Sequence, residues 1–189
     1  GLSGPQLPWF VDSFFVGAML TQFPIGWISD RVDRRFLILV VALVSVVGGI
    51  AGMLSLDNFT LMLVAGFILG GTANPLYSLL LAHTNDFVSL EEMAGTSGSL
   101  LFINGLGAIS GPLVTGWLMT QFGPVSYFGY MVGLMAILAA YAAYRTAQRP
   151  APSVDDTASY TPIAPTSSPV AFEVAQIVAE EALESENER

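Results

Sequence analysis

The stretch from Gly26 to Arg35, which reads G-W-I-S-D-R-V-D-R-R, separates two long apolar segments and holds three of the six arginines in the chain. The chain has no lysine, and no arginine occurs anywhere between residues 36 and 144. The other three arginines are Arg145, Arg149 and Arg189. Because multispanning membrane proteins concentrate basic residues in the loops on their cytoplasmic side, this distribution predicts a membrane protein whose 26–35 loop is cytoplasmic.

The composition supports the same prediction. The 189 residues are 53% hydrophobic and only 11% charged, with a mean hydropathy of +0.63. A soluble domain normally carries about a quarter charged residues to solvate its surface. The net charge is −9, and residues 145–189 account for −5 of it, with eight acids and three arginines. With no basic surface we expect no nucleic-acid partner.

The residue types also argue against an enzyme. There is no cysteine and only one histidine, His83, so a thiolate or histidine metal site is not expected. We find no nucleophile paired with a base, no phosphate-binding glycine loop and no cluster of metal ligands. We therefore expect no catalytic residue and no cofactor.

Five apolar stretches are long enough to cross about 30 Å of hydrocarbon as helices. They cover residues 10–29, 36–56, 60–82, 95–119 and 126–144. With the 26–35 loop inside, their alternation places the amino terminus outside and residues from 145 onward in the cytoplasm. An odd number of spans that starts outside predicts that further chain lies upstream. The expected fold is an all-α membrane bundle over residues 1–145.

Residues 146–189 differ from the bundle and form an expected cytoplasmic tail. Residues 150–169 are rich in proline, serine and threonine, which predicts disorder. Residues 170–185 could form a short acidic helix. This acidic segment would be repelled by an anionic membrane leaflet, so a protein contact or no contact is favoured over membrane binding.

Four of the five spans carry a G-x-x-x-G step, which lets membrane helices approach closely. The pairs are Gly48/Gly52, Gly66/Gly70, Gly107/Gly111 and Gly129/Gly133. These steps predict a packed bundle rather than five independent anchors.

Polar side chains are unevenly distributed among the spans. They gather in the first, third and fourth, which we expect to have something polar to face, while the second and fifth face lipid or other apolar surface. Asp12 is a candidate for proton or ion coupling, or a carboxylate solvated near the outer boundary. Gln22, Asn74, Tyr77 and Asn104 fall near the middle of their spans, where each could contact a substrate or hydrogen-bond another helix.

The 26–35 loop resembles motif A of the major facilitator superfamily, G-x-x-x-D-R-x-G-R-R/K. Five residues match, and Asp33 replaces the usual glycine. The matching residues are Gly26, Asp30, Arg31, Arg34 and Arg35. In the fourth span, a segment similar to the G-x-x-x-G-P-x-x-x-G pattern of family helix eleven is formed by Gly107, Gly111, Pro112 and Gly116. The resemblance covers residues 1–145, and the short loops look like those of an uncharacterised YcaD-like bacterial branch.

The resemblance implies the following. The five spans would be helices eight to twelve, most of the carboxy-terminal six-helix bundle of a twelve-helix transporter in a bacterial cytoplasmic membrane. The amino-terminal half would lie upstream. Such a protein moves a small solute by alternating access, in either direction and with or without protons. An alternative is a non-transporting receptor or scaffold that acts through the acidic tail.

Motif A would act as a latch that holds the cytoplasmic face closed. Asp30 would pair with an arginine or with a helix amino terminus. The arginines would lie near the other cytoplasmic acids, Asp86, Glu91 and Glu92. The alternative is that the arginines only fix the topology and contact lipid headgroups.

Overall fold

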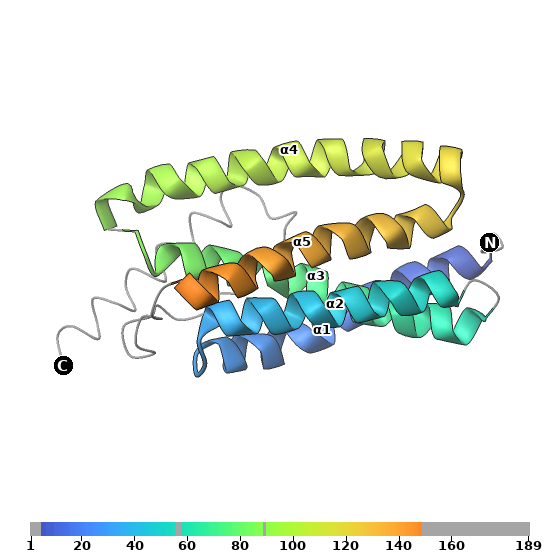
Figure 1. Ribbon diagram of the computed structural model, residues 1–189, viewed down its shortest axis with the longest axis horizontal. Helices are drawn as coiled ribbons and strands as arrows, with labels where there is room; N and C mark the ends of the chain where they lie inside the picture. The colour runs from blue at the N-terminus through green and yellow to red at the C-terminus, as the bar shows by residue number, and fades with distance from the viewer. Residues whose placement is uncertain (1–4, 56–57, 89, 149–189) are drawn as a thin grey trace.

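A computed structural model describes residues 5–55, 58–88 and 90–148 (Figure 1). These residues form five helices and no strand. The helices are α1 (Gln6–Ser29), α2 (Arg34–Leu54), α3 (Phe59–Asn85), α4 (Leu90–Phe122) and α5 (Val125–Gln148). The predicted all-α membrane fold is confirmed. The expected disordered segment 150–169 and the possible helix 170–185 lie outside the described residues.

Each expected span falls on one helix, with ends that agree within a few residues. Within the described residues, four helices are long and apolar enough to cross a membrane: α2, α3, Gly95–Phe122 of α4, and α5. The helix α1 is not among them, because Asp12, Thr21 and Gln22 lower its hydropathy. A membrane span at α1 therefore remains a prediction.

The helices contact one another in an order that differs from their order in the sequence. The helix α3 packs against both α1 and α2, α2 also packs against α5, and α4 packs mainly against α5. Figure 1 shows α4 along one side of the bundle, where it contacts α5. One buried cluster joins α2, α3 and α5 through Leu37, Ile38, Val41, Leu76, Leu79 and Ala142.

Glycines bring the backbones of α1 and α3 into direct contact. A Cβ atom added at Gly70 would lie 1.9 Å from the Phe14 carbonyl oxygen, and one at Gly17 would lie 2.1 Å from the Phe67 carbonyl oxygen. Only residues without a Cβ allow this separation. Thr21 then joins the two helices, because its hydroxyl donates to the Gly71 carbonyl oxygen at 2.6 Å.

The other glycine steps differ in what they touch. Gly52 on α2 faces the ring of Phe128, where a Cβ would approach within 2.3 Å. The glycines of the helix-eleven pattern in α4 meet nothing within 4 Å inside the described chain; they are Gly107, Gly111 and Gly116. The close approach predicted from the G-x-x-x-G steps is thus confirmed for α2 and α3. In α5, a Cβ at Gly129 would come no nearer than 3.9 Å to another side chain and one at Gly133 would meet nothing within 4 Å of the described chain, so the packing role of the α4 and α5 glycines stays a prediction.

Candidate functional site at the α1–α2 loop

The loop between α1 and α2 is short and is fixed at both ends by aspartates. Asp30 is the C-cap of α1, and its backbone N–H donates to the Gly26 carbonyl oxygen at 3.2 Å. Asp33 is the N-cap of α2, where its carboxylate accepts the backbone N–H of Arg35 at 2.9 Å. Such a cap satisfies one of the free N–H groups of the first helical turn.

Asp33 stands where motif A usually has glycine, and the structure shows why this is tolerated. Its backbone has φ −54° and ψ 116°, a conformation open to any L residue. No residue other than glycine has a positive φ in the described chain. The loop therefore does not need glycine at this position, and the carboxylate adds a helix cap instead.

The centre of the site is Arg34, whose side chain is almost fully buried. Its Nε donates to Ser29 Oγ at 3.2 Å, and its Nη1 donates to the Ala82 carbonyl oxygen at 3.3 Å. The same Nη1 also donates to the carboxylate of Asp86, which is buried as well. Nη2 lies 3.6 Å from Asp30 Oδ1. We call these five residues the Arg34 cluster.

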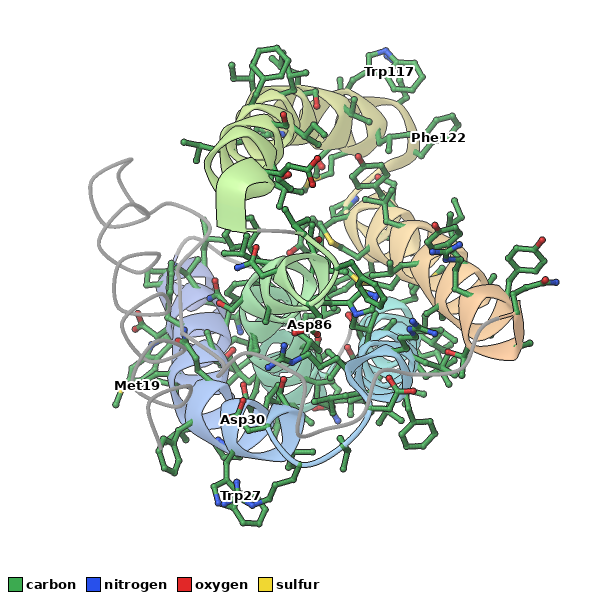
Figure 2. All side chains as sticks on the ribbon, turned by 90° about the vertical axis from the view of Figure 1, so that its left-hand side faces the viewer. Met19, Trp27, Asp30, Asp86, Trp117 and Phe122 are labelled. Atoms are coloured by element: carbon green, nitrogen blue, oxygen red, sulfur yellow. The ribbon has the colours of Figure 1, made fainter. Side chains whose placement is uncertain are left out.

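The Arg34 cluster joins the ends of three helices. Ser29 and Asp30 come from the end of α1, Arg34 begins α2, and Asp86 caps the end of α3. Figure 2 looks onto this end of the bundle and labels both aspartates. Removing one partner from a buried ion pair leaves the other charge uncompensated, which costs about 3–5 kcal/mol. The cluster therefore holds α1, α2 and α3 together at this end.

Two residues of the motif are exposed: Arg31, which lies outside the Arg34 cluster, and Asp30, which is its outermost member. Arg31 is exposed, its Nη1 donates to the Trp27 carbonyl oxygen at 2.9 Å, and its guanidinium lies 4.0 Å from the centre of the Trp27 ring. The Asp30 side chain is 38% exposed, against 2% for Arg34. By contrast Gly26 is buried in α1, and Arg35 is buried with its guanidinium 5.2 Å from the Phe87 ring centre.

The expected proximity of the arginines to Asp86 is confirmed for Arg34. The side chain of Glu91 lies outside the described set, and Glu92 is exposed. Two partners of Arg34 were not predicted from the sequence, Ser29 and the Ala82 carbonyl group. A serine within an apolar helix and a backbone carbonyl carry no sequence signal of their own.

The candidate cavity residues are placed on three different helices. Gln22 on α1 and Asn74 on α3 are half-buried, as is Asn104 on α4. Tyr77 and Leu100 both pack against Leu81, so α3 and α4 meet one helical turn from Asn104. Their roles as substrate ligands remain predictions.

Two further candidates are exposed. Asp12 lies on an exposed face of α1, and Pro112 lies on an exposed face of α4. Coupling at Asp12 and packing at Pro112 both remain predictions.

The fold and loop define an α-helical integral membrane protein with a charged connection between two of its helices. The family model of the Major Facilitator Superfamily matches residues 1–178, and the chain belongs to this family.

The relatives are bacterial. An uncharacterized MFS-type transporter of Yersinia enterocolitica, YE1530, is 27% identical over 72% of this chain and 35% of its own length. The uncharacterized MFS-type transporter YcaD of Escherichia fergusonii is 29% identical over 65% of this chain and 31% of its own. YcaD of an Escherichia coli strain is 30% identical over the same shares. The chain thus spans about a third of these relatives, and no solved structure matches it.

Proposed function

We propose that this chain forms helices eight to twelve of a secondary active transporter that moves a small solute by alternating access. Family membership and relatives named as MFS-type transporters support the proposal. The relatives are about three times as long as the matched region, which leaves room for an amino-terminal half. Exposed apolar side chains on α1 and α4, such as Phe23 and Leu113, would pack against that half or against lipid.

The main support for this mechanism is that motif A has two buried arginines, Arg34 and Arg35, and two exposed charged residues, Asp30 and Arg31. The Arg34 cluster makes the ends of α1, α2 and α3 one rigid unit, as alternating access by rocking of rigid halves requires. Asp30 and Arg31, on the outer side of the same loop, would contact the other half when the cytoplasmic face is closed. Asp30 is also within ion-pair distance of Arg34. A contact between Asp30 and the other half would therefore act directly on the Arg34 cluster.

The remaining site assignments belong to the same proposal. Gln22, Asn74, Tyr77 and Asn104 would line the solute cavity, and Asp12 would carry a coupling proton if the transport is proton-driven. The loop and residues from 145 onward would lie in the cytoplasm of a bacterium. The arginine distribution supports this orientation.

Transport itself is tested by solute flux. The full-length protein that contains this chain is reconstituted in proteoliposomes and offered a broad panel of small solutes, with and without a proton gradient. The proposal expects flux of at least one solute that stops when Arg34 is replaced. Stable protein with no flux, together with a partner that binds only when residues 149–189 are present, would favour a receptor or scaffold instead.

Orientation is tested by cysteine labelling, because this chain has no native cysteine. The turn after α4 contains Gly123 with φ +82°, where cysteine would be strained, so exposed Gln121 is the better position. Cysteine at Gln121 should react with an impermeant thiol reagent from outside, and cysteine at Val32 should not. The opposite pattern would reverse the orientation and the helix numbering.

A further inference from the structure

Pro75 lies in the interior of α3, and its side chain is fully buried. Proline has no N–H, so within a helix it cannot donate to the carbonyl oxygen four residues earlier. In α3 that carbonyl group belongs to Gly71. A carbonyl group freed by proline inside a membrane has no water to bond and is usually satisfied by a neighbouring helix or a hydroxyl side chain.

A hydroxyl donor for this carbonyl group comes from α1. Thr21 Oγ1 lies 2.6 Å from the Gly71 carbonyl oxygen and 2.9 Å from the Gly17 carbonyl oxygen of its own helix. A hydroxyl has one proton to donate. The Gly17 carbonyl has the backbone N–H of Thr21 in the usual i+4 position, whereas the Gly71 carbonyl has the proline nitrogen there. The shorter contact and the missing N–H both favour donation to Gly71.

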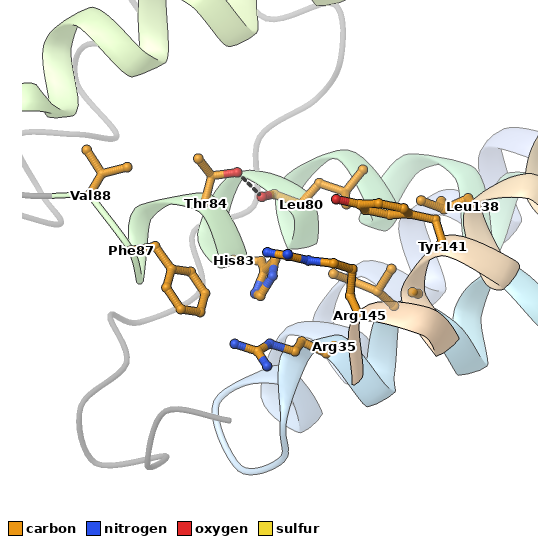
Figure 3. Close-up of a pocket in the computed structure, with 11 residues that line it drawn as sticks. Arg35, Leu80, His83, Thr84, Phe87, Val88, Leu138, Tyr141 and Arg145 are labelled. Carbon is orange, nitrogen blue, oxygen red and sulfur yellow. Dashed lines mark hydrogen bonds between the residues drawn. The ribbon is translucent and has the colours of Figure 1, made fainter. Parts of the chain in front are cut away.

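This bond between helices differs from the bonds that other threonines make. Near the end of α3, Thr84 donates to the Leu80 carbonyl oxygen of its own helix at 2.9 Å (Figure 3). A bond to the carbonyl group four residues earlier in the same helix is also made by Thr72, Thr120 and Thr146. Such bonds satisfy the hydroxyl without joining two helices.

The close approach of the two backbones allows a side chain as short as threonine to reach across. A Cβ atom added at Gly71 would lie 2.9 Å from Thr21 Cγ2 and 3.3 Å from the Gly17 carbonyl oxygen. A larger residue at position 71 would therefore push Thr21 away from the carbonyl oxygen that it binds.

The turn that Pro75 weakens carries one of the candidate cavity residues. Asn74 immediately precedes Pro75, and Gln22 immediately follows Thr21. A helix bends most easily where proline removes one of its hydrogen bonds. The direction in which Asn74 is held relative to α1 therefore depends on what replaces that bond.

We propose that Thr21 is a positioning residue: its hydroxyl replaces, from α1, the hydrogen bond that Pro75 removes from α3, and thereby fixes the turn that carries Asn74. The other end of this half of α3 is fixed by Asp86 in the Arg34 cluster. The role of Asn74 toward a solute rests on the proposed function. The bond and its effect on the turn do not require transport.

The first test is a double-mutant cycle, measured by thermal unfolding of the full-length protein. Thr21→Val keeps the shape of the side chain and removes its hydroxyl, which should lower the unfolding temperature by about 1–4 °C. In the Pro75→Ala background the same change should have little effect, because residue 75 then donates its own N–H to Gly71. Equal losses in the two backgrounds would overturn the proposal.

Hydrogen–deuterium exchange reports on the turn itself. In Thr21→Val, the backbone N–H groups of residues 76–79 should exchange about two- to tenfold faster, because one hydrogen bond fewer raises the population of the open turn by that factor. Thr21→Ser keeps the hydroxyl and should exchange like the wild type. Unchanged exchange in Thr21→Val would overturn the proposal.

The matched control for both measurements is Thr84→Val. It makes the same substitution in α3 but removes a bond within a single helix. It should leave the exchange of residues 76–79 unchanged and should shift the unfolding temperature equally with and without Pro75→Ala. Acceleration as large as that of Thr21→Val would mean that the turn responds to any lost hydroxyl, which would contradict a specific role for Thr21.

If Thr21→Val gives no folded protein, the proposal is tested by rescue. Thr21→Ser should then fold, and adding Pro75→Ala to Thr21→Val should restore folding. Failure of both would overturn the proposal, because neither the hydroxyl nor a new backbone donor would then matter.

Solute flux separates this inference from the proposed function. Thr21→Val should raise the solute concentration that gives half-maximal flux about two- to tenfold, and Thr84→Val should not. An unchanged half-maximal concentration would overturn the positioning of Asn74. Absence of flux in the wild type would contradict the proposed function instead, while the unfolding cycle and the exchange rates would still decide the role of Thr21 in the turn.

Discussion

The two sides of the α1–α2 loop carry charges from one short motif but place them in opposite surroundings. On the inner side, Arg34 is bound to Asp86 at the end of α3, and both side chains are 2% exposed. On the outer side, Asp30 is 38% exposed and Arg31 lies over Trp27 at the surface. A buried charge pair is costly to break, whereas an exposed one contributes little to stability. The inner side is therefore suited to holding the fold, and the outer side to the contact that the proposed transport cycle would form and break.

The largest effect is expected on the inner side. Arg34→Ala removes the arginine that binds the buried Asp86 carboxylate and should destabilise the protein by about 3–5 kcal/mol. Thermal unfolding of the purified full-length protein measures this loss. Asp86→Asn should also destabilise it, and the double variant should cost less than the sum of the two because the residues act as a pair. Additive losses would show that the two side chains are not coupled.

The next effect concerns transport rather than stability. Asp30→Asn keeps the size of the side chain and removes its charge at an exposed helix end, so protein level should stay near normal. Loss of one charge-assisted contact costs about 1.5–3 kcal/mol in the state that makes it, which shifts a two-state population roughly ten- to a hundredfold. Solute flux should fall sharply. If Asp30→Asn lowered the thermal stability as much as Arg34→Ala does, the two sides of the loop would contribute equally to stability and the proposed difference between them would be wrong.

Asp33 offers a smaller test of how this loop departs from the motif. Asp33→Ala removes the N-cap of α2 and should lower stability by about 1 kcal/mol. Asp33→Gly, which restores the usual motif residue, should cost only about a few tenths of that. Both values come from thermal unfolding. If glycine were the more damaging of the two, the cap would not explain the tolerance of aspartate.

Arg31 is expected to matter least for stability. An exposed cation over an aromatic ring is worth about 0.5–1 kcal/mol, so Arg31→Ala should unfold close to the wild-type temperature. Its transport should nevertheless fall, as for Asp30→Asn, because both residues lie on the outer side. Normal flux in Arg31→Ala would restrict the proposed contact to Asp30.

The sequence predicted the elements better than their partners. Apolar runs and an arginine-bearing loop were enough to place five helices, because hydrophobic length and turn residues are local properties. The same G-x-x-x-G spacing occurs in α3 and α4, yet Gly70 lies against the Phe14 backbone while Gly111 meets nothing in the described chain. Spacing shows that a helix can be approached closely and does not show which helix approaches it.

The same limit applies to the candidate site. The motif identified Asp30, Arg31, Arg34 and Arg35 as a set, but their division into buried and exposed members depends on α3. The end of α3 supplies Asp86 and the Ala82 carbonyl oxygen from about 50 residues further along the chain. Only the packing of α1, α2 and α3 decides which arginine reaches them.

The most direct test of the central claim is the accessibility of the cavity from the cytoplasmic side when Asp30 is changed. A single cysteine at Gln22 is labelled with an impermeant maleimide in inside-out vesicles, in the wild-type and Asp30→Asn backgrounds, with cysteine at Gln121 as the control for the opposite end. If the outer side of the loop holds the cytoplasmic face closed, Asp30→Asn should increase the labelling rate at Gln22 about tenfold or more. Unchanged labelling with normal flux would contradict the latch and leave the arginines as markers of topology.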